Sequence, residues 1–146
     1  MYKRQGLLRE VDTSLTSFFK ATEELGVSDQ VTTFTASDFG RTLTSNGDGS
    51  DHGWGSHHFV MGGGLKGAHF YGEAPPVSAS DSNSAEDQWH VGQGRLLPRT
   101  STDQFAATLA RWFGVPEQDL GWILPNLKNF GAQAGRPDYP TDLGYF

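Results

Sequence analysis

Cysteine is absent from all 146 residues of the sequence. Disulfide bonds, zinc–thiolate sites and thiol nucleophiles are therefore excluded, although the absence does not choose a cellular compartment. Long apolar runs are also missing, because no stretch approaches the roughly 18 residues that a membrane-spanning helix needs. Basic residues number 11 against 17 acidic ones, which gives a net charge of −6. Nucleic acids and anionic lipids require basic surfaces, so this charge argues against both as partners.

The residues that are present suit one ordinary domain or a piece of a larger one. Apolar residues make up 36% of the chain and include 10 Phe and 4 Trp, so a hydrophobic core is possible. Charged residues make up only 19%, which is not the composition of a charge-rich disordered chain. The 19 glycines indicate a chain with many tight turns and close backbone approaches.

Periodicity in the first third of the chain predicts a helix followed by a strand. The apolar residues between Leu7 and Leu25 recur on one helical face, and Gly26 stands where a helix C-cap is expected. Residues 31–36 are β-branched and aromatic, which favours a strand, and residues 57–61 predict a second short strand. A helix and a strand in this order predict an α/β fold, here with few strands and long loops.

Turn residues and helix caps indicate the structure of the remaining segments. Residues 37–56 are turn-rich, and the low-complexity residues 78–87 predict a solvated loop. Ser101–Gln104 matches a capping box for a helix that Gly114 ends, and residues 117–124 predict one more short helix. The tail from Gly131 is rich in Gly, Pro and Asp, so we expect it to be flexible and poorly packed.

Three short motifs match known patterns but lack the required context. Residues 62–67 fit the dinucleotide-binding G-x-G-x-x-G pattern, yet no good helix follows them. Residues 38–40 spell the magnesium motif of kinases without the other kinase motifs. Residues 46–57 begin like an EF-hand loop but lack its central Gly and its final Glu. All three functions are therefore rejected.

Acidic and imidazole groups near the predicted strands form the strongest candidate site. Asp38 follows the first predicted strand, and in α/β sheets ligands are held at the carboxyl ends of strands. Asp51 and His52 lie in the glycine-rich segment before the second predicted strand, which His57 opens. Oxygen and nitrogen ligands of this kind suit a divalent metal ion, for which zinc, manganese and calcium are all candidates.

Arg41 lies three residues past Asp38 and could present its planar guanidinium to an anionic ester. Each candidate also has a structural interpretation, which the spacing leaves open. Asp38 could form a turn and pair with Arg41, Asp51 could cap a turn, and the histidines could be ordinary surface groups. In a strand His57 and His58 would face opposite sides, so only one of them could join a site on a given face.

Longer runs of the sequence resemble a widespread bacterial family that is catalogued as domain of unknown function 1501. The resemblance is carried by residues 31–41 (VTTFTASDFGR), residues 46–55 (NGDGSDHGWG) and residues 61–67 (MGGGLKG). Residues 100–114 are similar to the family's late helix. Together these runs extend the resemblance over about residues 7–130.

That family resembles the alkaline phosphatase and sulfatase superfamily, whose members hydrolyse phosphate or sulfate esters with one or two divalent metals. The resemblance implies the C-terminal portion of an alkaline-phosphatase-like sheet with flanking helices. In the superfamily a late strand ends in Ser-Asp-His-Gly, whose Asp and His bind metal, and here residues 37–40 read Ser-Asp-Phe-Gly. The resemblance thus gives Asp38 the ligand position, whereas Phe39 replaces the histidine. His52, or as a second choice His57, is the candidate for the missing imidazole.

The superfamily's nucleophile lies near the N-terminus of its domain, and no part of this chain matches that region. We therefore expect a fragment that lacks the N-terminal part of its own domain and is inactive alone. Its parent would act on a small anionic ester. Many family members carry twin-arginine export signals, which implies a periplasmic or exported parent, although this chain shows no such signal. Residues 1–5 resemble a translated sequencing adaptor and are expected to be a non-native leader, residues 6–130 the domain fragment, and residues 131–146 the tail.

Two functions follow from this resemblance. In a hydrolase, Asp38 and His52 would bind the metal, Asp51 would be a ligand or would orient one, and Arg41 would stabilise charge on the ester oxygens. The alternative is a non-catalytic metal-binding or scaffold protein that retains the fold, which the Phe39 replacement favours. A small domain without any site is a third possibility, but the apolar helix face of residues 7–25 needs a larger sheet to cover it.

Overall fold

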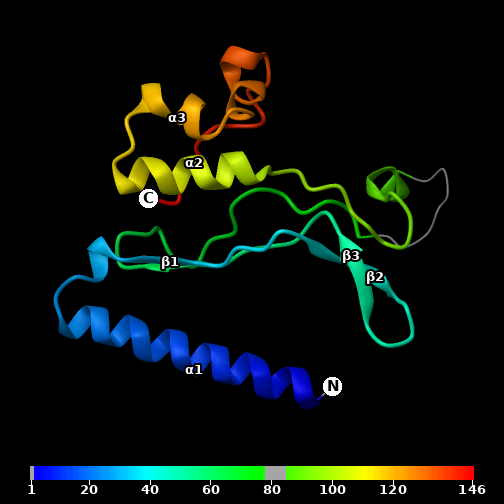
Figure 1. Cartoon of the computed structure of the whole chain (residues 1–146), viewed down its shortest axis with the longest axis horizontal. Helices are drawn as coiled ribbons and strands as arrows, with labels where there is room; N and C mark the ends of the chain where they lie inside the picture. Colours follow the sequence, from blue (N-terminus) through cyan, green and yellow to red (C-terminus); the bar gives the residue numbers. More distant parts are fainter. Residues whose placement is uncertain (1, 78–84) are drawn as a thin grey trace. The chain divides into compact units, whose positions relative to one another are not determined.

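A computed structural model of the chain describes residues 2–77 and 85–146 and contains helices and short strands (Figure 1). The strands form two separate antiparallel pairs, β1 with β4 and β2 with β3. The chain divides into two compact units: the first holds the residues up to Thr35 and His58–Gly67, and the second holds Ala36–His57 and Ala68–Phe146. The prediction of a mixed α/β fold with few strands and long loops is confirmed.

The first unit begins with α1, which spans Tyr2–Glu24 and confirms the predicted amphipathic helix. The helix ends as expected at Gly26, whose φ of +69° is left-handed and whose N–H donates to the carbonyl oxygen of Glu23 over 2.9 Å. Apolar side chains along α1, namely Leu7, Leu8, Val11 and Phe18, are exposed. The 3₁₀ turn Ser28–Gln30 follows.

Strand β1, Thr32–Phe34, pairs antiparallel with β4, Val60–Gly62. In this register Thr32 lies opposite Gly62, and Phe34 lies opposite Val60. Both strands were predicted, but the second was placed too early, because β4 starts at Val60. The pairing continues just before β4, because the N–H of Thr35 donates to the carbonyl oxygen of Phe59 over 3.0 Å.

The second unit contains a β-hairpin where the sequence predicted only turns. Strand β2 spans Gly40–Ser45, and β3 spans Ser50–Gly53 (Figure 1). The turn between them closes through the N–H of Asn46, which donates to the carbonyl oxygen of Gly49, while the Asn46 side chain accepts the N–H of Asp48. The cluster of Asn, Gly and Asp that looked like irregular loop is therefore the turn of a hairpin.

Helix α2, Thr102–Phe113, has the predicted capping box at its N-terminus. The Ser101 hydroxyl oxygen accepts the Gln104 N–H over 3.1 Å, and the Gln104 side-chain oxygen accepts the Ser101 N–H over 2.9 Å. Gly114 ends the helix with a left-handed φ of +96°. Pro116 then caps the short helix α3, Glu117–Ile123, which was also predicted.

The core of this unit lies between α2, α3 and the 3₁₀ turn Leu127–Asn129. Its buried residues are Ala107, Leu120 and Leu127, and the partly buried Ala110, Val115 and Leu124 pack against them. Leu120 faces inward from α3 because the helix turns its apolar side toward α2. The core is small, so polar contacts carry much of the packing around α2.

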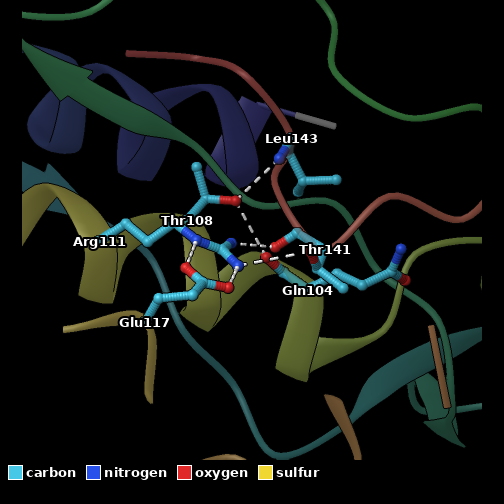
Figure 2. Close-up of polar contacts among 6 residues, drawn as sticks. All are labelled: Gln104, Thr108, Arg111, Glu117, Thr141 and Leu143. Carbon is cyan, nitrogen blue, oxygen red and sulfur yellow. Dashed lines mark hydrogen bonds and ion pairs between the residues drawn. The ribbon is translucent and has the colours of Figure 1, made fainter. Parts of the chain in front are cut away.

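The C-terminal segment packs against α2, in contrast to the poorly packed tail that its composition suggested. The Thr108 hydroxyl accepts the Leu143 N–H over 2.9 Å, and the Gln104 amide donates to the Pro140 carbonyl oxygen over 2.7 Å. Figure 2 shows Arg111 in contact with both Glu117 and Thr141. Side-chain groups of α2 thus satisfy backbone groups of residues 140–143, which lie in no helix or strand.

The low-complexity segment is described only in part, because residues 78–84 lie outside the described residues. Its remaining residues are mixed, because Ala85 is exposed whereas Asp87 is buried. Glu86–Trp89 forms a 3₁₀ turn, and Asp87 is only 7% exposed. Across residues 2–77 and 85–146 the helices are too short or too polar to span a membrane.

Candidate functional site

The β2–β3 hairpin carries most of the candidate site residues. Arg41 on β2 lies directly opposite His52 on β3, and Gly40 lies opposite Gly53. Cross-strand partners share one face of a hairpin, so the guanidinium and the imidazole are neighbours. Both side chains are exposed. This face of the hairpin therefore presents a cationic group and a titratable ring to solvent.

Phe39 joins the same face. Its ring stacks on the His52 ring with centroids 3.6 Å apart and planes 13° apart. The guanidinium carbon of Arg41 lies 5.3 Å from the Phe39 centroid, and Arg41 Nη1 donates to the Ser50 carbonyl oxygen over 2.8 Å. Cation–π attraction and this hydrogen bond hold Arg41 in place. Phe39, Arg41 and His52, hereafter the hairpin triad, form one connected cluster.

Gly40 allows the close approach of two backbone segments that positions the hairpin triad. A Cβ at position 40 would lie 1.8 Å from the carbonyl oxygen of Gly55, so no other residue fits without a backbone shift. The close approach fixes the start of β2 against the residues that follow β3. Phe39, which precedes Gly40, is thereby held over the His52 ring.

Asp38 is exposed and precedes the hairpin triad by one residue. The sequence placed it directly after the first strand, and this prediction is wrong: β1 ends at Phe34, and Asp38 comes just before β2 instead. Both strand pairs are antiparallel. The carboxyl edge of a parallel sheet, on which the prediction relied, is thus not formed by these strands.

Asp51 lies on the other face of the hairpin. Successive residues of a strand point to opposite faces, so Asp51 and His52 diverge. The Asp51 carboxylate accepts the Asn46 side-chain N–H over 2.8 Å, and its backbone N–H donates to the Thr42 hydroxyl over 3.0 Å. Asp51 therefore closes the hairpin turn in this structure, as one of the structural interpretations proposed.

His57 was predicted to open the second strand, and it does not. It is exposed and lies before β4, which starts at Val60. His57 belongs to the unit with the hairpin, whereas His58 belongs to the unit with β1 and β4. His58 Nδ1 lies 3.2 Å from the Thr35 hydroxyl. The two histidines therefore have different surroundings, although they are neighbours in sequence.

No group of three or more His, Asp or Glu side chains with the spacing of a metal site occurs within residues 2–77 and 85–146. The hairpin triad with Asp38 offers one carboxylate and one imidazole, which lie 14 residues apart on segments joined by the Phe39–His52 stack. Two such ligands are fewer than the four that a structural zinc site uses. The described residues could supply part of a metal site or an anion-binding surface.

A buried histidine that the sequence analysis did not single out lies beside the hairpin. His90 is 8% exposed, and its Nε2 accepts the Gly94 N–H over 2.5 Å. The carbonyl oxygens of Gln93 and Gly94 in turn accept the N–H groups of Thr44 and Leu43 on β2. His90 thus shapes the turn that supports β2. In the sequence, only the glycines that follow His90 could have indicated this turn. The burial of a residue in a loop leaves no periodic pattern from which it could be predicted.

The ion pair at the end of α2 shifts the pKa of both of its members. Arg111 donates to both carboxylate oxygens of Glu117 over 2.8 and 2.7 Å (Figure 2). This hydrogen bonding lowers the pKa of Glu117 and raises that of Arg111. The pair links the end of α2 to the start of α3, which indicates a structural role.

Comparison with known proteins gives one match. A family model described as a protein of unknown function, DUF1501, matches residues 2–119, which is most of the chain. The match includes the hairpin and α2, on which the resemblance in the sequence also rests. Neither the curated proteins nor the solved structures contain a match to this chain.

Proposed function

The chain belongs to the DUF1501 family of proteins of unknown function, and on that premise we propose that its hairpin is part of the active site of a metal-dependent ester hydrolase. The hydrolase would be of the alkaline phosphatase and sulfatase type and would act on a phosphate or sulfate ester. The proposal is that this chain carries the later part of the site, while the nucleophile lies in a region that it does not match. The chain by itself would then not hydrolyse esters.

The hairpin triad is the observation that carries this proposal. The Phe39–His52 stack at 3.6 Å keeps the segment that contains Asp38 beside strand β3. A carboxylate and an imidazole are thereby brought to neighbouring segments without being adjacent in sequence. Arg41 lies across from His52 on the same exposed face. A guanidinium beside such a pair suits the oxygens of an anionic ester.

The residues fit a metal only in part. Asp38 and His52 would be two ligands, and the others would come from outside the described residues, which hold no complete ligand group. A bound divalent ion would polarise the ester oxygen. Arg41 would stabilise the negative charge that develops on the non-bridging oxygens. Asp51, held by Asn46 over 2.8 Å, would act by fixing the hairpin that carries His52.

Restoring an imidazole at position 39 tests whether these residues face a common ion. We expect Phe39→His to bind zinc at least about tenfold more tightly than the unchanged chain, because a third ligand joins Asp38 and His52. Calorimetric titration of the full chain with zinc measures the affinity. Phe39→Leu is the matched control, since it also removes the aromatic stack but adds no ligand.

Two further variants link any gain to the proposed ligands. Adding Asp38→Asn or His52→Ala to Phe39→His is expected to return zinc affinity to the level of Phe39→Leu. If Phe39→His binds zinc no more tightly than Phe39→Leu, the common site does not exist. A gain that survives both added substitutions would equally refute the assignment of Asp38 and His52.

A scaffold function without catalysis is the second candidate. It is favoured by the contacts of the hairpin triad itself, because Arg41 Nη1 is engaged by the Ser50 carbonyl oxygen and by the Phe39 ring. In this function the same side chains stabilise the hairpin. A chain in which Phe39→His gains no zinc affinity would support the scaffold over the hydrolase.

A further inference from the structure

We propose that the corner between α2 and α3 is a docking site for a partner protein, specifically for a basic side chain carried on an apolar segment. The site is separate from the hairpin. A groove of about 540 Å³ lies at this corner. It is lined by Phe113, Gly114, Val115, Pro116, Asp119, Trp122 and Ile123, hereafter the corner groove.

Two aromatic side chains that line the corner groove, Phe113 and Trp122, are highly exposed to solvent. Phe113 is 81% exposed, and Trp122 is 89% exposed. Ile123 beside them is also exposed. Large apolar side chains gathered around one depression mark an interaction surface more often than they occur by chance on a soluble domain. Trp in particular is enriched among the residues that dominate binding energy at protein interfaces.

The backbone holds this arrangement in place. Gly114, with its left-handed φ of +96°, ends α2, and Pro116 starts α3 two residues later. The two hydrogen bonds between Arg111 and Glu117 brace the same corner. Leu120 is buried on the inner side of α3, so the groove-lining residues of this helix lie on another side. The backbone at this corner is therefore fixed before binding, which lowers part of the entropic cost.

Charge complementarity defines the partner. Asp119 lines the groove, and within residues 2–77 and 85–146 its carboxylate has no hydrogen bond or ion pair. The charge of nearby Glu117 is already balanced by Arg111. Asp119 and Trp122 are three residues apart and share one side of α3. A guanidinium or ammonium between them would gain both an ion pair and a cation–π contact.

The openness of the site favours a protein over a small molecule. Small-molecule sites are concave and bury most of the ligand. Here the two aromatic walls keep more than four fifths of their surface exposed. A segment of another protein can cover such walls with apolar side chains while it places one basic group at Asp119. The occupant is thus a basic, apolar stretch of a partner chain.

A peptide titration of the full chain tests this site. The indole N–H signal of Trp122 in a ¹⁵N spectrum is identified by its loss in Trp122→Phe. The probe is the capped tripeptide acetyl-Leu-Arg-Leu-amide, and its Gln and Glu analogues serve for comparison. We expect the Arg peptide to shift the Trp122 signal and to bind about two- to fivefold more tightly than the Gln peptide. The Glu peptide is expected to bind most weakly.

Variants assign the preference to the groove. Asp119→Asn is expected to remove most of the difference between the Arg and Gln peptides, and Phe113→Ala to weaken binding of both. Phe70→Ala is the matched control, because Phe70 is a fully exposed aromatic outside the groove. Equal binding of the Arg and Glu peptides would overturn the proposal. Retention of the Arg preference in Asp119→Asn, or no shift of the Trp122 signal with any peptide, would do the same.

Discussion

Tyr145 is the second-last residue of the chain, yet it is only 3% exposed. Its hydroxyl donates to the Phe105 carbonyl oxygen over 2.9 Å, and its ring lies against Tyr71 at a centroid distance of 5.4 Å. Burial raises the pKa of Tyr145 to about 12. A charged phenolate would be poorly solvated in this position, so the folded state favours the neutral form.

Stability is therefore expected to fall at alkaline pH. The pKa of Tyr145 is about 10 in an unfolded chain and about 12 in the folded one. Its contribution is fully present below about pH 10 and is lost as the pH rises towards 12, because only the unfolded state releases the proton there. Urea unfolding of the chain and of Tyr145→Phe at a series of pH values measures this. Tyr145→Phe should lose less stability over that interval; parallel losses in both proteins would contradict the assignment.

At the candidate site, residue type and spacing did not predict how the side chains are arranged. Arg41 and His52 were each proposed from residue type and spacing, and they are cross-strand partners. The stack of Phe39 on His52 was not foreseen, because it depends on hairpin register. Asp51 and His52 look like a pair in sequence, but strand alternation separates them. Register is a long-range property that local spacing does not encode.

At the scale of elements, the capping box of α2 offers a direct test. Ser101→Ala removes the oxygen that accepts the Gln104 N–H, and we expect it to lower the free energy of unfolding by about 1 kcal/mol. Ser101→Asp is the matched control, since a carboxylate caps equally well and suits the positive end of the helix. Urea unfolding followed by circular dichroism gives both values. A cost as large for Asp as for Ala would show that the cap is not the cause.

The helices could be predicted from the sequence, whereas the hairpin and the tail could not. Helices α1, α2 and α3 follow from apolar periodicity and from caps, which are local signals. Strands β2 and β3 are short and rich in Ser, Thr and Gly, so they resemble loop. The tail packs through side chains of α2, such as Thr108 and Gln104, that lie 35 and 36 residues away from their partners. The composition of the tail therefore could not predict that it packs against α2.

At the scale of the whole chain, the two units differ in how well their helices are covered. Helix α2 carries buried Gln104, Ala107 and Thr108 and packs against α3 and the C-terminal segment. Helix α1 is 23 residues long, and among its described side chains only Thr22 is buried. In proteins most of the stability of a helix comes from tertiary packing of its apolar face. The first unit should therefore open more readily than the second.

Amide hydrogen exchange of the full chain, analysed residue by residue by NMR at low protein concentration, would measure this difference. We expect amides in the middle of α1, residues 8–20, to exchange at least about tenfold faster than those of residues 105–110 in α2, because local opening is cheaper where few apolar contacts are lost. The comparison is between helical amides, so both sets begin with the same type of hydrogen bond. Equal protection in the two helices would mean that the exposed Leu8, Val11 and Phe18 are covered in solution by another surface. Faster exchange in α1 would instead confirm that few apolar contacts stabilise this helix.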